Sequence, residues 1–106
     1  MESTVNTSEA FEQYLGEVRQ ILQAALAEVP CHVYLFGSRA IGTAHPGSDA
    51  DIAVAAEEDI GLSLSEARFA LEESTIPYKV DLVDLSQTSL DFRRQVLAEG
   101  KLIWKN

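Results

Sequence analysis

Two aspartates separated by one residue, Asp49 and Asp51, stand at the start of an apolar run and are well placed to bind a divalent cation. Alternate residues of a β-strand point to the same face, so we expect these carboxylates to lie about 6–7 Å apart on one side of a strand. Magnesium prefers a few carboxylates together with phosphate oxygens and water. The pair therefore predicts a magnesium site, with ordinary loop acids at a strand start as the alternative.

A glycine–serine pair, Gly37-Ser38, ends the preceding apolar run. Glycine permits backbone conformations and close approaches that a side chain would block. Ser38 and the amide groups that open a following helical turn are suited to hold phosphate oxygens, and the alternative is an ordinary strand-to-helix turn. Arg39 is expected either to contact phosphate or to pair with a nearby acid.

A third acid, Asp81, lies among the apolar residues Val80, Leu82 and Val83. Because a buried carboxylate without a partner is costly, Asp81 is expected either to be hydrogen-bonded within the core or to join the metal site from a neighbouring strand. Asp84 is three residues further on, so it should face the opposite way and serve in a turn or a cap. Asp81 is therefore the third predicted ligand.

Together these residues suit the transfer of a nucleotidyl group. Two magnesium ions about 3.5–4 Å apart would clamp the attacking and leaving oxygens of an in-line displacement. Asp49 and Asp51 are expected to bridge both ions. Asp81 would complete the site of the ion that activates the attacking hydroxyl and would help to take its proton. Gly37 and Ser38 would hold the β- and γ-phosphates of the incoming nucleotide.

The elements that must position these residues alternate between helices and strands. The sequence predicts a helix over 8–29 with an apolar stripe that includes Phe11, Leu15, Val18 and Leu22, a strand over 31–36 and a helical turn over 38–41. We then expect a strand over 51–56, a helix over 63–74 opened by a capping box at Ser63–Glu66, and a strand over 79–85. The last elements expected are a helix that starts at 88 or 89 and ends just before Gly100, with Phe92, Val96 and Leu97 facing inward, and a strand over 102–104. Strands that are apolar on both faces indicate an α/β sheet covered by helices. The first two strands are joined by a connection too short for a parallel crossover, so a small mixed sheet is expected.

Length and composition predict one domain over residues 1–106, with a loose tail at 1–7. The net charge of −9 argues against a stand-alone nucleic-acid binder. No apolar run approaches the ~18 residues of a membrane helix, and the polar, acidic N-terminus resembles neither a secretory signal nor a transit peptide, so a cytoplasmic protein is expected. The single cysteine, Cys31, excludes an internal disulfide and is expected to be a buried hydrophobe.

The first motif resembles the signature of the DNA polymerase β-like nucleotidyltransferase superfamily: it reads Gly37-Ser38-Arg39-Ala40-x-Gly42, then five residues, then Ser48-Asp49-x-Asp51. The run over 80–85 looks like the minimal nucleotidyltransferase (MNT) branch. The resemblance implies a polymerase β-like fold. It also implies an antitoxin of the HEPN–MNT pairs, which transfers AMP from ATP to a tyrosine hydroxyl of a helical HEPN ribonuclease toxin, with magnesium as cofactor.

Two other functions remain open at this point. The chain could neutralise a toxin by direct binding without catalysis, or it could adenylylate a small molecule or an RNA end. The three acids favour the protein-modifying enzyme. An acidic protein would also suit a basic, RNA-cleaving partner.

Overall fold

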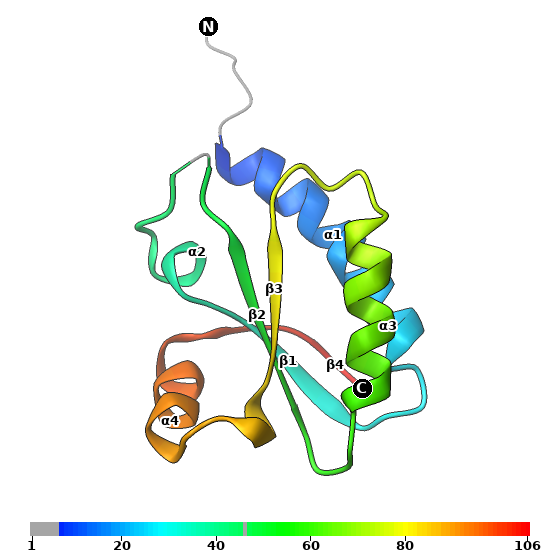
Figure 1. Cartoon of the computed structure of the whole chain (residues 1–106). Coiled ribbons are helices and arrows are strands. Elements are labelled where there is room, and N and C mark those ends of the chain that lie inside the picture. The colour runs from blue at the N-terminus through cyan, green and yellow to red at the C-terminus, as the bar shows by residue number, and fades with distance from the viewer. Residues whose placement is uncertain (1–6, 46) are drawn as a thin grey trace, which may run out of the picture.

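The computed structural model describes residues 7–45 and 47–106 of the chain. The elements follow in the order α1 (Thr7–Ala25), β1 (Cys31–Phe36), α2 (Ser38–Ile41), β2 (Ala50–Ala56), α3 (Gly61–Glu72), β3 (Val80–Asp84), a 3₁₀ turn η1 (Leu85–Gln87), α4 (Leu90–Glu99) and β4 (Lys101–Lys105), as Figure 1 shows. The predicted tail lies outside the described residues except for Thr7, at which α1 begins.

The strands form one mixed sheet in the order β3-β2-β1-β4. The central strand β1 runs antiparallel to both β2 and β4, whereas β2 runs parallel to β3. The short connection through α2 turns the chain back, while α3 provides the longer crossover that a parallel pair needs. The predicted mixed sheet is thereby confirmed.

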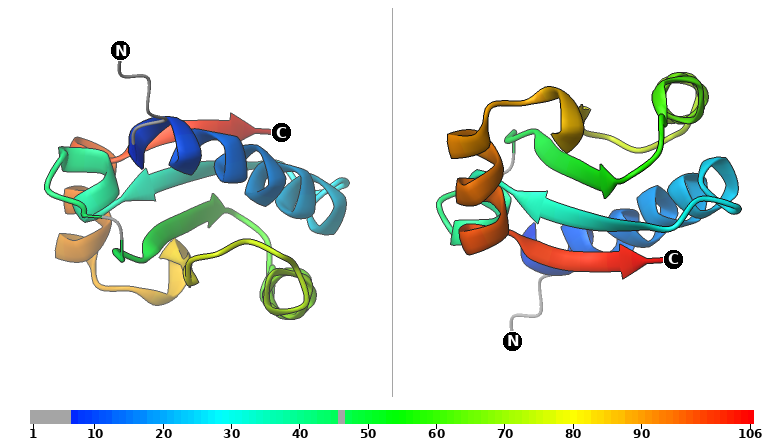
Figure 2. Two further views of the ribbon diagram at one scale, coloured as in Figure 1. Left: turned by 90° about the horizontal axis from the view of Figure 1, so that it is seen from above. Right: turned by 90° about the horizontal axis from the view of Figure 1, so that it is seen from below.

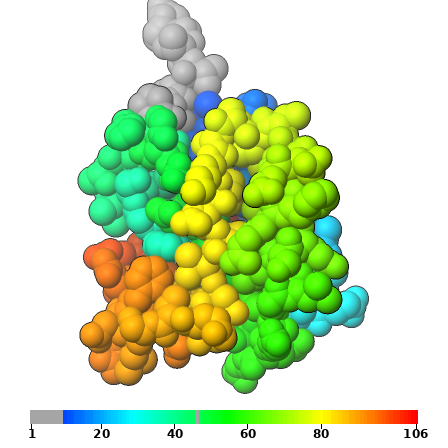
Figure 3. Space-filling model, viewed as in Figure 1, coloured from blue at the N-terminus to red at the C-terminus, as the bar shows by residue number. Residues whose placement is uncertain are grey.

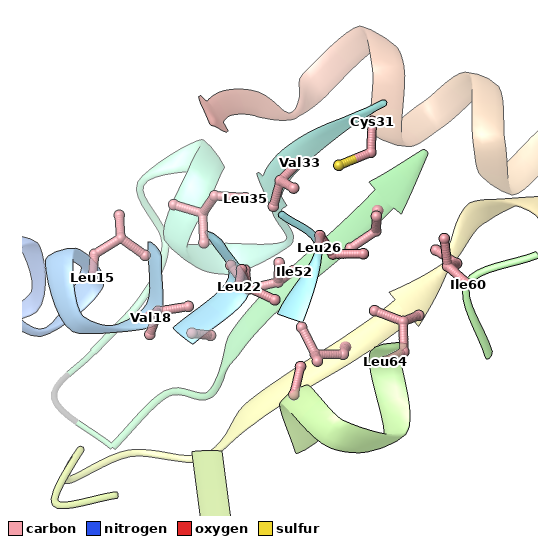
Figure 4. Packing of buried hydrophobic residues seen from close by; sticks show 14 of the residues in the cluster. Leu15, Val18, Leu22, Leu26, Cys31, Val33, Leu35, Ile52, Ile60 and Leu64 are labelled. Carbon is pink, nitrogen blue, oxygen red and sulfur yellow. The ribbon is translucent and has the colours of Figure 1, made fainter. Parts of the chain in front are cut away.

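Helices cover both faces of this sheet. The main core joins α1 and α3 to one face of β1, β2 and β3, and Figure 4 shows its side chains interdigitating. A smaller core lies on the other face, where α4 and η1 pack on alternate strand residues. The two views of Figure 2 show α4 and α3 at opposite sides of the strands. Alternate residues of β1 and β2 therefore pack against different helices.

The first helix presents the predicted apolar stripe to the sheet, with Phe11, Leu15, Val18 and Leu22 all buried. The helix ends at Ala25, so the prediction that it extends to Val29 is wrong. The last carbonyl groups are satisfied from the far end of the chain. The Asn106 side-chain amide donates to the carbonyl oxygens of Leu26 and Ala27 at 2.9 Å and to that of Val29 at 3.1 Å.

The ends of the later helices depend on single side chains. The predicted capping box at Ser63 is wrong, because α3 already begins at Gly61, whose amide donates to Asp59 Oδ1 at 2.9 Å. The predicted start of α4 is confirmed, since the Ser89 hydroxyl accepts from the Phe92 amide at 3.1 Å. Leu97 was expected to face inward, but it is 49% exposed.

Cys31 is buried as predicted, and burial raises the pKa of its thiol. Its side chain therefore belongs to the core of the protein. Among the described residues, the helices are too short or too polar to span a bilayer.

Candidate active site

The predicted site residues meet where β1 ends and β2 and β3 begin. Antiparallel pairing places Phe36 opposite Asp51, and parallel pairing places Asp51 opposite Asp81. Residues that face one another on adjacent strands point to the same side of a sheet, and the strands lie about 4.8 Å apart. The carboxylates of Asp51 and Asp81 therefore share the face of the sheet that carries α4. Sheet pairing brings together two acids that are thirty residues apart in the sequence.

Asp51 lies at the centre of this arrangement and is half-buried. Partial burial, which disfavours the charged form, raises the pKa of its carboxyl above the ordinary value, and the negative charges of Asp81 and Asp49 raise it further. Both neighbouring carboxylates are thus close enough to act on Asp51. The carboxylates of Asp49, Asp51 and Asp81 therefore concentrate negative charge, which destabilises the folded protein unless a cation is bound.

Asp81 differs from its prediction in one respect. It was expected to be buried among apolar neighbours, but its side chain is exposed. The reason is that β3 is an edge strand, and α4 covers the sheet away from the end at which Asp81 lies. Of the two roles left open by the sequence, the structure shows Asp81 beside Asp51, as the metal-site role requires. Asp84 takes the predicted cap role, since its carboxylate accepts from the Ser86 amide at 3.0 Å.

Asp49 precedes β2 at the end of a loop that is held by local hydrogen bonds. The Ser48 amide donates to the carbonyl oxygen of His45 at 2.9 Å, and the His45 amide donates to the Ser48 hydroxyl at 2.9 Å. The Arg39 Nη2 atom donates to the Ser48 carbonyl oxygen at 2.8 Å. The backbone directly before Asp49 is therefore tied to α2.

Gly37 connects β1 to α2 with φ +73° and ψ −155°, a conformation that is almost restricted to glycine. A Cβ atom on Gly37 would collide with the Asp51 carboxylate. The glycine therefore permits the chain to turn and the carboxylate to lie directly against it. Ser38 follows as the first residue of α2. The amides of Ala40 and Ile41 donate to the Gly37 carbonyl oxygen at 3.0 and 3.2 Å, so the amides of Ser38 and Arg39 are the ones that have no carbonyl partner within the helix.

The Arg39 side chain lies behind this turn, on aromatic rings. Its guanidinium carbon is 4.3 Å from the centre of the Phe11 ring and 5.5 Å from that of Tyr78. From the sequence, Arg39 was expected to contact phosphate or to pair with a nearby acid. Neither the Phe11 ring nor the Tyr78 ring was identified as its partner. No local motif marks Phe11 or Tyr78, because each reaches the site region only through the packing of α1 and of the segment before β3.

The donor set suits a hard cation that also binds phosphate. Three carboxylates lie on or beside one end of the sheet, and the charge on Asp51 is disfavoured by partial burial and by the charges of its two neighbours. Within residues 7–45 and 47–106, no group of three or more acidic, histidine or cysteine side chains is arranged to hold a metal ion by itself. Magnesium usually takes only one or two carboxylates and completes its shell with phosphate and water. The residues present therefore fit magnesium that arrives with a nucleotide.

The raised pKa of Asp51 predicts how stability changes with pH when divalent cations are absent. The unfolded pKa is about 3.9, and the folded pKa is higher, so the native state binds more protons between these values. The contribution of Asp51 to the free energy of unfolding should therefore fall as the pH rises through this window. Urea unfolding at several pH values from about 4 to 6 would measure it.

Two variants test this dependence of stability on pH. Asp51→Asn should gain stability relative to the wild type as the pH rises, because it removes the disfavoured charge. Asp91→Asn, at an exposed acid in the first turn of α4, controls for the loss of one negative charge. The prediction fails if both variants show the same dependence on pH, or if the advantage of Asp51→Asn shrinks as the pH rises.

Comparison with known proteins agrees with this geometry. Residues 17–106 match the family model described as polymerase beta, nucleotidyltransferase. The chain is 40% identical over 80 residues to a Haemophilus influenzae protein named "Probable protein adenylyltransferase MntA", covering 74% of this chain and 68% of that protein. It is 41% identical over 75 residues to "Protein adenylyltransferase MntA" of Shewanella oneidensis, covering 68% of this chain. The chain spans about half the length of the Shewanella protein, 52%.

Solved structures share the fold. A toxin–antitoxin complex with AMP-PNP contains a chain that is 33% identical, with a TM-score of 0.69, covering 86% of this chain and 73% of the other. A complex of a tri-AMPylated Shewanella oneidensis HEPN toxin with its MNT antitoxin matches at 28% identity and a TM-score of 0.65, covering 90% of this chain and 72% of the other. The resemblance and the fold class expected from the sequence are confirmed. With the family model matching most of its length, this chain belongs to the polymerase beta nucleotidyltransferase family.

Proposed function

We propose that this protein is an adenylyltransferase that transfers AMP from ATP to a tyrosine hydroxyl of a HEPN-type ribonuclease toxin and thereby acts as its antitoxin in the cytoplasm. The observation that carries the proposal is the alignment of Asp51 with Asp81 across β2 and β3, beside the Gly37-Ser38 turn. The relatives named as protein adenylyltransferases and the AMPylated HEPN toxin complex support the choice of donor and acceptor.

Each residue has a distinct part in the proposed reaction. Gly37 and Ser38 hold the β- and γ-phosphates of ATP by backbone amides and a hydroxyl. The tyrosine oxygen bonds to the α-phosphorus while the bond from the α-phosphorus to the bridging oxygen breaks, and the β- and γ-phosphates leave as pyrophosphate. Asp49 and Asp51 would hold magnesium together with the phosphate oxygens, and Asp81 would be the third ligand. Bound magnesium would neutralise the charge that develops on the phosphate oxygens during transfer. Asp81 is exposed, so it is also accessible to the acceptor hydroxyl and able to take its proton.

The open surface around the carboxylates favours a protein as acceptor. Figure 3 shows β3, in yellow, at the surface between α2 and α3. A hollow of about 680 Å³ does exist, but it lies at the other end of β2, against Ala55 and Glu58, and its lining includes none of the predicted site residues. A small acceptor bound there would be far from Asp51. A tyrosine presented on a partner protein would reach the exposed acids directly.

Mass spectrometry of the partner toxin tests the proposal. The product of the neighbouring gene, tested as the toxin, is co-expressed with the wild type or with the Asp49→Ala/Asp51→Ala variant, and is then incubated with ATP and magnesium. We expect the toxin to gain mass in steps of one AMP with the wild type only. Fragment spectra should place the AMP on tyrosine.

Two other outcomes would favour the remaining hypotheses. A stable complex without any mass gain, in which the double variant still neutralises the toxin, would indicate an antitoxin that acts by contact. Release of pyrophosphate from ATP with a small molecule or RNA, but not with the toxin, would indicate a different acceptor. Either result would overturn the proposed protein adenylylation.

A further inference from the structure

We propose that Arg39 is a positioning residue, which holds the segments before β2 and β3 so that Asp49 and Asp81 lie beside the phosphate turn. It would then act through other residues and not as a direct contact to the nucleotide. The inference rests on the proposed function, but it concerns a contact network that the family comparison does not assign. This positioning role replaces the expectation, drawn from the sequence, that Arg39 contacts phosphate.

The first part of the network joins α2 to the loop that carries Asp49. Arg39 follows Ser38 directly, so its backbone belongs to the phosphate turn. Its Nη2 atom donates to the carbonyl oxygen of Ser48 at 2.8 Å, and Ser48 is bonded to Asp49. This hydrogen bond fixes the distance between the turn that would hold phosphate and the backbone of the first metal ligand.

The second part joins the same guanidinium to the segment that leads to Asp81. The Arg39 guanidinium lies over the Phe11 ring and beside the Tyr78 ring, and these two rings are 5.2 Å apart. Tyr78 precedes Lys79, whose carbonyl oxygen accepts from the Ala50 amide at 2.9 Å. The contact of Arg39 with the Tyr78 ring therefore stabilises the end of the sheet at which β2 and β3 begin to pair, next to Asp49 and Asp81.

The position of the guanidinium also explains why it is a poor phosphate ligand here. One edge of the guanidinium donates to the Ser48 carbonyl oxygen, and one of its faces lies on the Phe11 ring. The Nε atom is buried and has no hydrogen-bond partner among the described residues. Arginine recognises phosphate through a fork of N–H groups that must point at it. To present that fork, Arg39 would have to leave the rings and release Ser48.

Kinetics of the Arg39→Lys variant distinguish the two roles. Lysine keeps the charge but loses the planar group that stacks on aromatic rings and donates in a fork. A positioning residue predicts that kcat for AMP transfer falls about 10- to 100-fold, while the KM for ATP changes by less than about threefold. A phosphate ligand predicts instead that the KM for ATP rises strongly, and this result would overturn the inference.

Arg19→Lys is the matched control. Arg19 is also partly buried and donates from Nε to a backbone carbonyl oxygen, that of Ile103, at 2.9 Å. Both variants lose a comparable hydrogen bond, so a purely structural effect should lower the melting temperature and the transfer rate in both to a similar degree. If Arg39→Lys and Arg19→Lys lose activity equally, Arg39 has no special role.

Hydrogen exchange gives a reading that does not depend on activity. In the protein without ligands, Arg39→Lys should speed exchange at the amides of Ser48 and Ala50, which donate to His45 and Lys79. Arg19→Lys should leave these two amides unchanged. Unchanged protection in Arg39→Lys would overturn the inference even if transfer by the wild type is confirmed, so its failure is separable from failure of the proposed function.

Substitutions of Tyr78 test the aromatic half of the network should Arg39→Lys fail to fold. Tyr78→Phe keeps the ring under the guanidinium and removes only the hydroxyl, whereas Tyr78→Leu removes the ring. We expect Tyr78→Phe to retain kcat and Tyr78→Leu to reduce it with little change in the KM for ATP. Equal behaviour of the two variants would contradict a role for the ring.

Discussion

Replacing Asp51 with asparagine is expected to lower the rate of AMP transfer about 100- to 1,000-fold, because the central carboxylate of the cluster loses the charge that a metal ion would require. The side chain keeps its shape, and the like-charge repulsion from Asp81 and Asp49 disappears. The variant should therefore be at least as stable as the wild type at neutral pH without metal. Single-turnover transfer to the toxin, together with thermal unfolding, measures both effects.

Asp84→Asn is the matched control for this experiment. Asp84 lies on the same strand as Asp81, and its carboxylate caps the following turn by accepting from the Ser86 amide and hydroxyl. Asparagine retains an acceptor oxygen for that cap. Transfer by Asp84→Asn should remain within about twofold of the wild type. A comparable loss in both variants would mean that overall charge, and not the Asp51 site, controls transfer.

Replacing Gly37 with alanine is expected to lower the rate of AMP transfer about 100-fold and to destabilise the fold. The backbone conformation of Gly37 would cost alanine about 1–3 kcal/mol. The new Cβ atom would also collide with the Asp51 carboxylate and force it to move. A displacement of about 1 Å at a reacting centre can reduce the rate about 100-fold. Initial rates of toxin modification and urea unfolding would report the two effects separately.

Gly42→Ala separates the backbone effect from the collision. Gly42 also has a positive φ, of +87°, but a Cβ atom built there has no neighbour within 4 Å. This variant should lose about 1 kcal/mol of stability and keep its transfer activity. If Gly37→Ala and Gly42→Ala lose activity to the same extent, strain in the turn explains the loss and contact with Asp51 does not.

Several features were predictable because neighbouring residues determine them. Pro30 and Gly37 bound the first strand, which spans Cys31–Phe36 as expected. The helical turn after Gly37 and the cap at Ser89 were also predicted correctly. In each case, the backbone preference or the hydrogen bond involves residues no more than a few positions apart, so the sequence contains the whole interaction.

The predictions for several other features were wrong, because those features depend on contacts between distant segments. The first helix ends at Ala25, and the carbonyl groups that follow it accept from Asn106 at the far end of the chain. Leu97 has the apolar character of a core residue, but in α4 Val96 is buried and Leu97 is 49% exposed. The position of a strand within the sheet is also a tertiary property, and the edge position of β3 leaves Asp81 exposed.

The candidate site divides in the same way. The spacing of residues along the sequence was enough to pair Asp49 with Asp51 and to place both after the Gly37-Ser38 turn. Only the parallel pairing of β2 with β3 set Asp81 opposite Asp51. Only tertiary packing placed the guanidinium of Arg39 over the Phe11 ring. The sequence by itself determined which chemical groups are present and which lie close along the chain, whereas the tertiary structure decided which distant groups face one another, because that depends on how sheet pairing and core packing close the long loops between them.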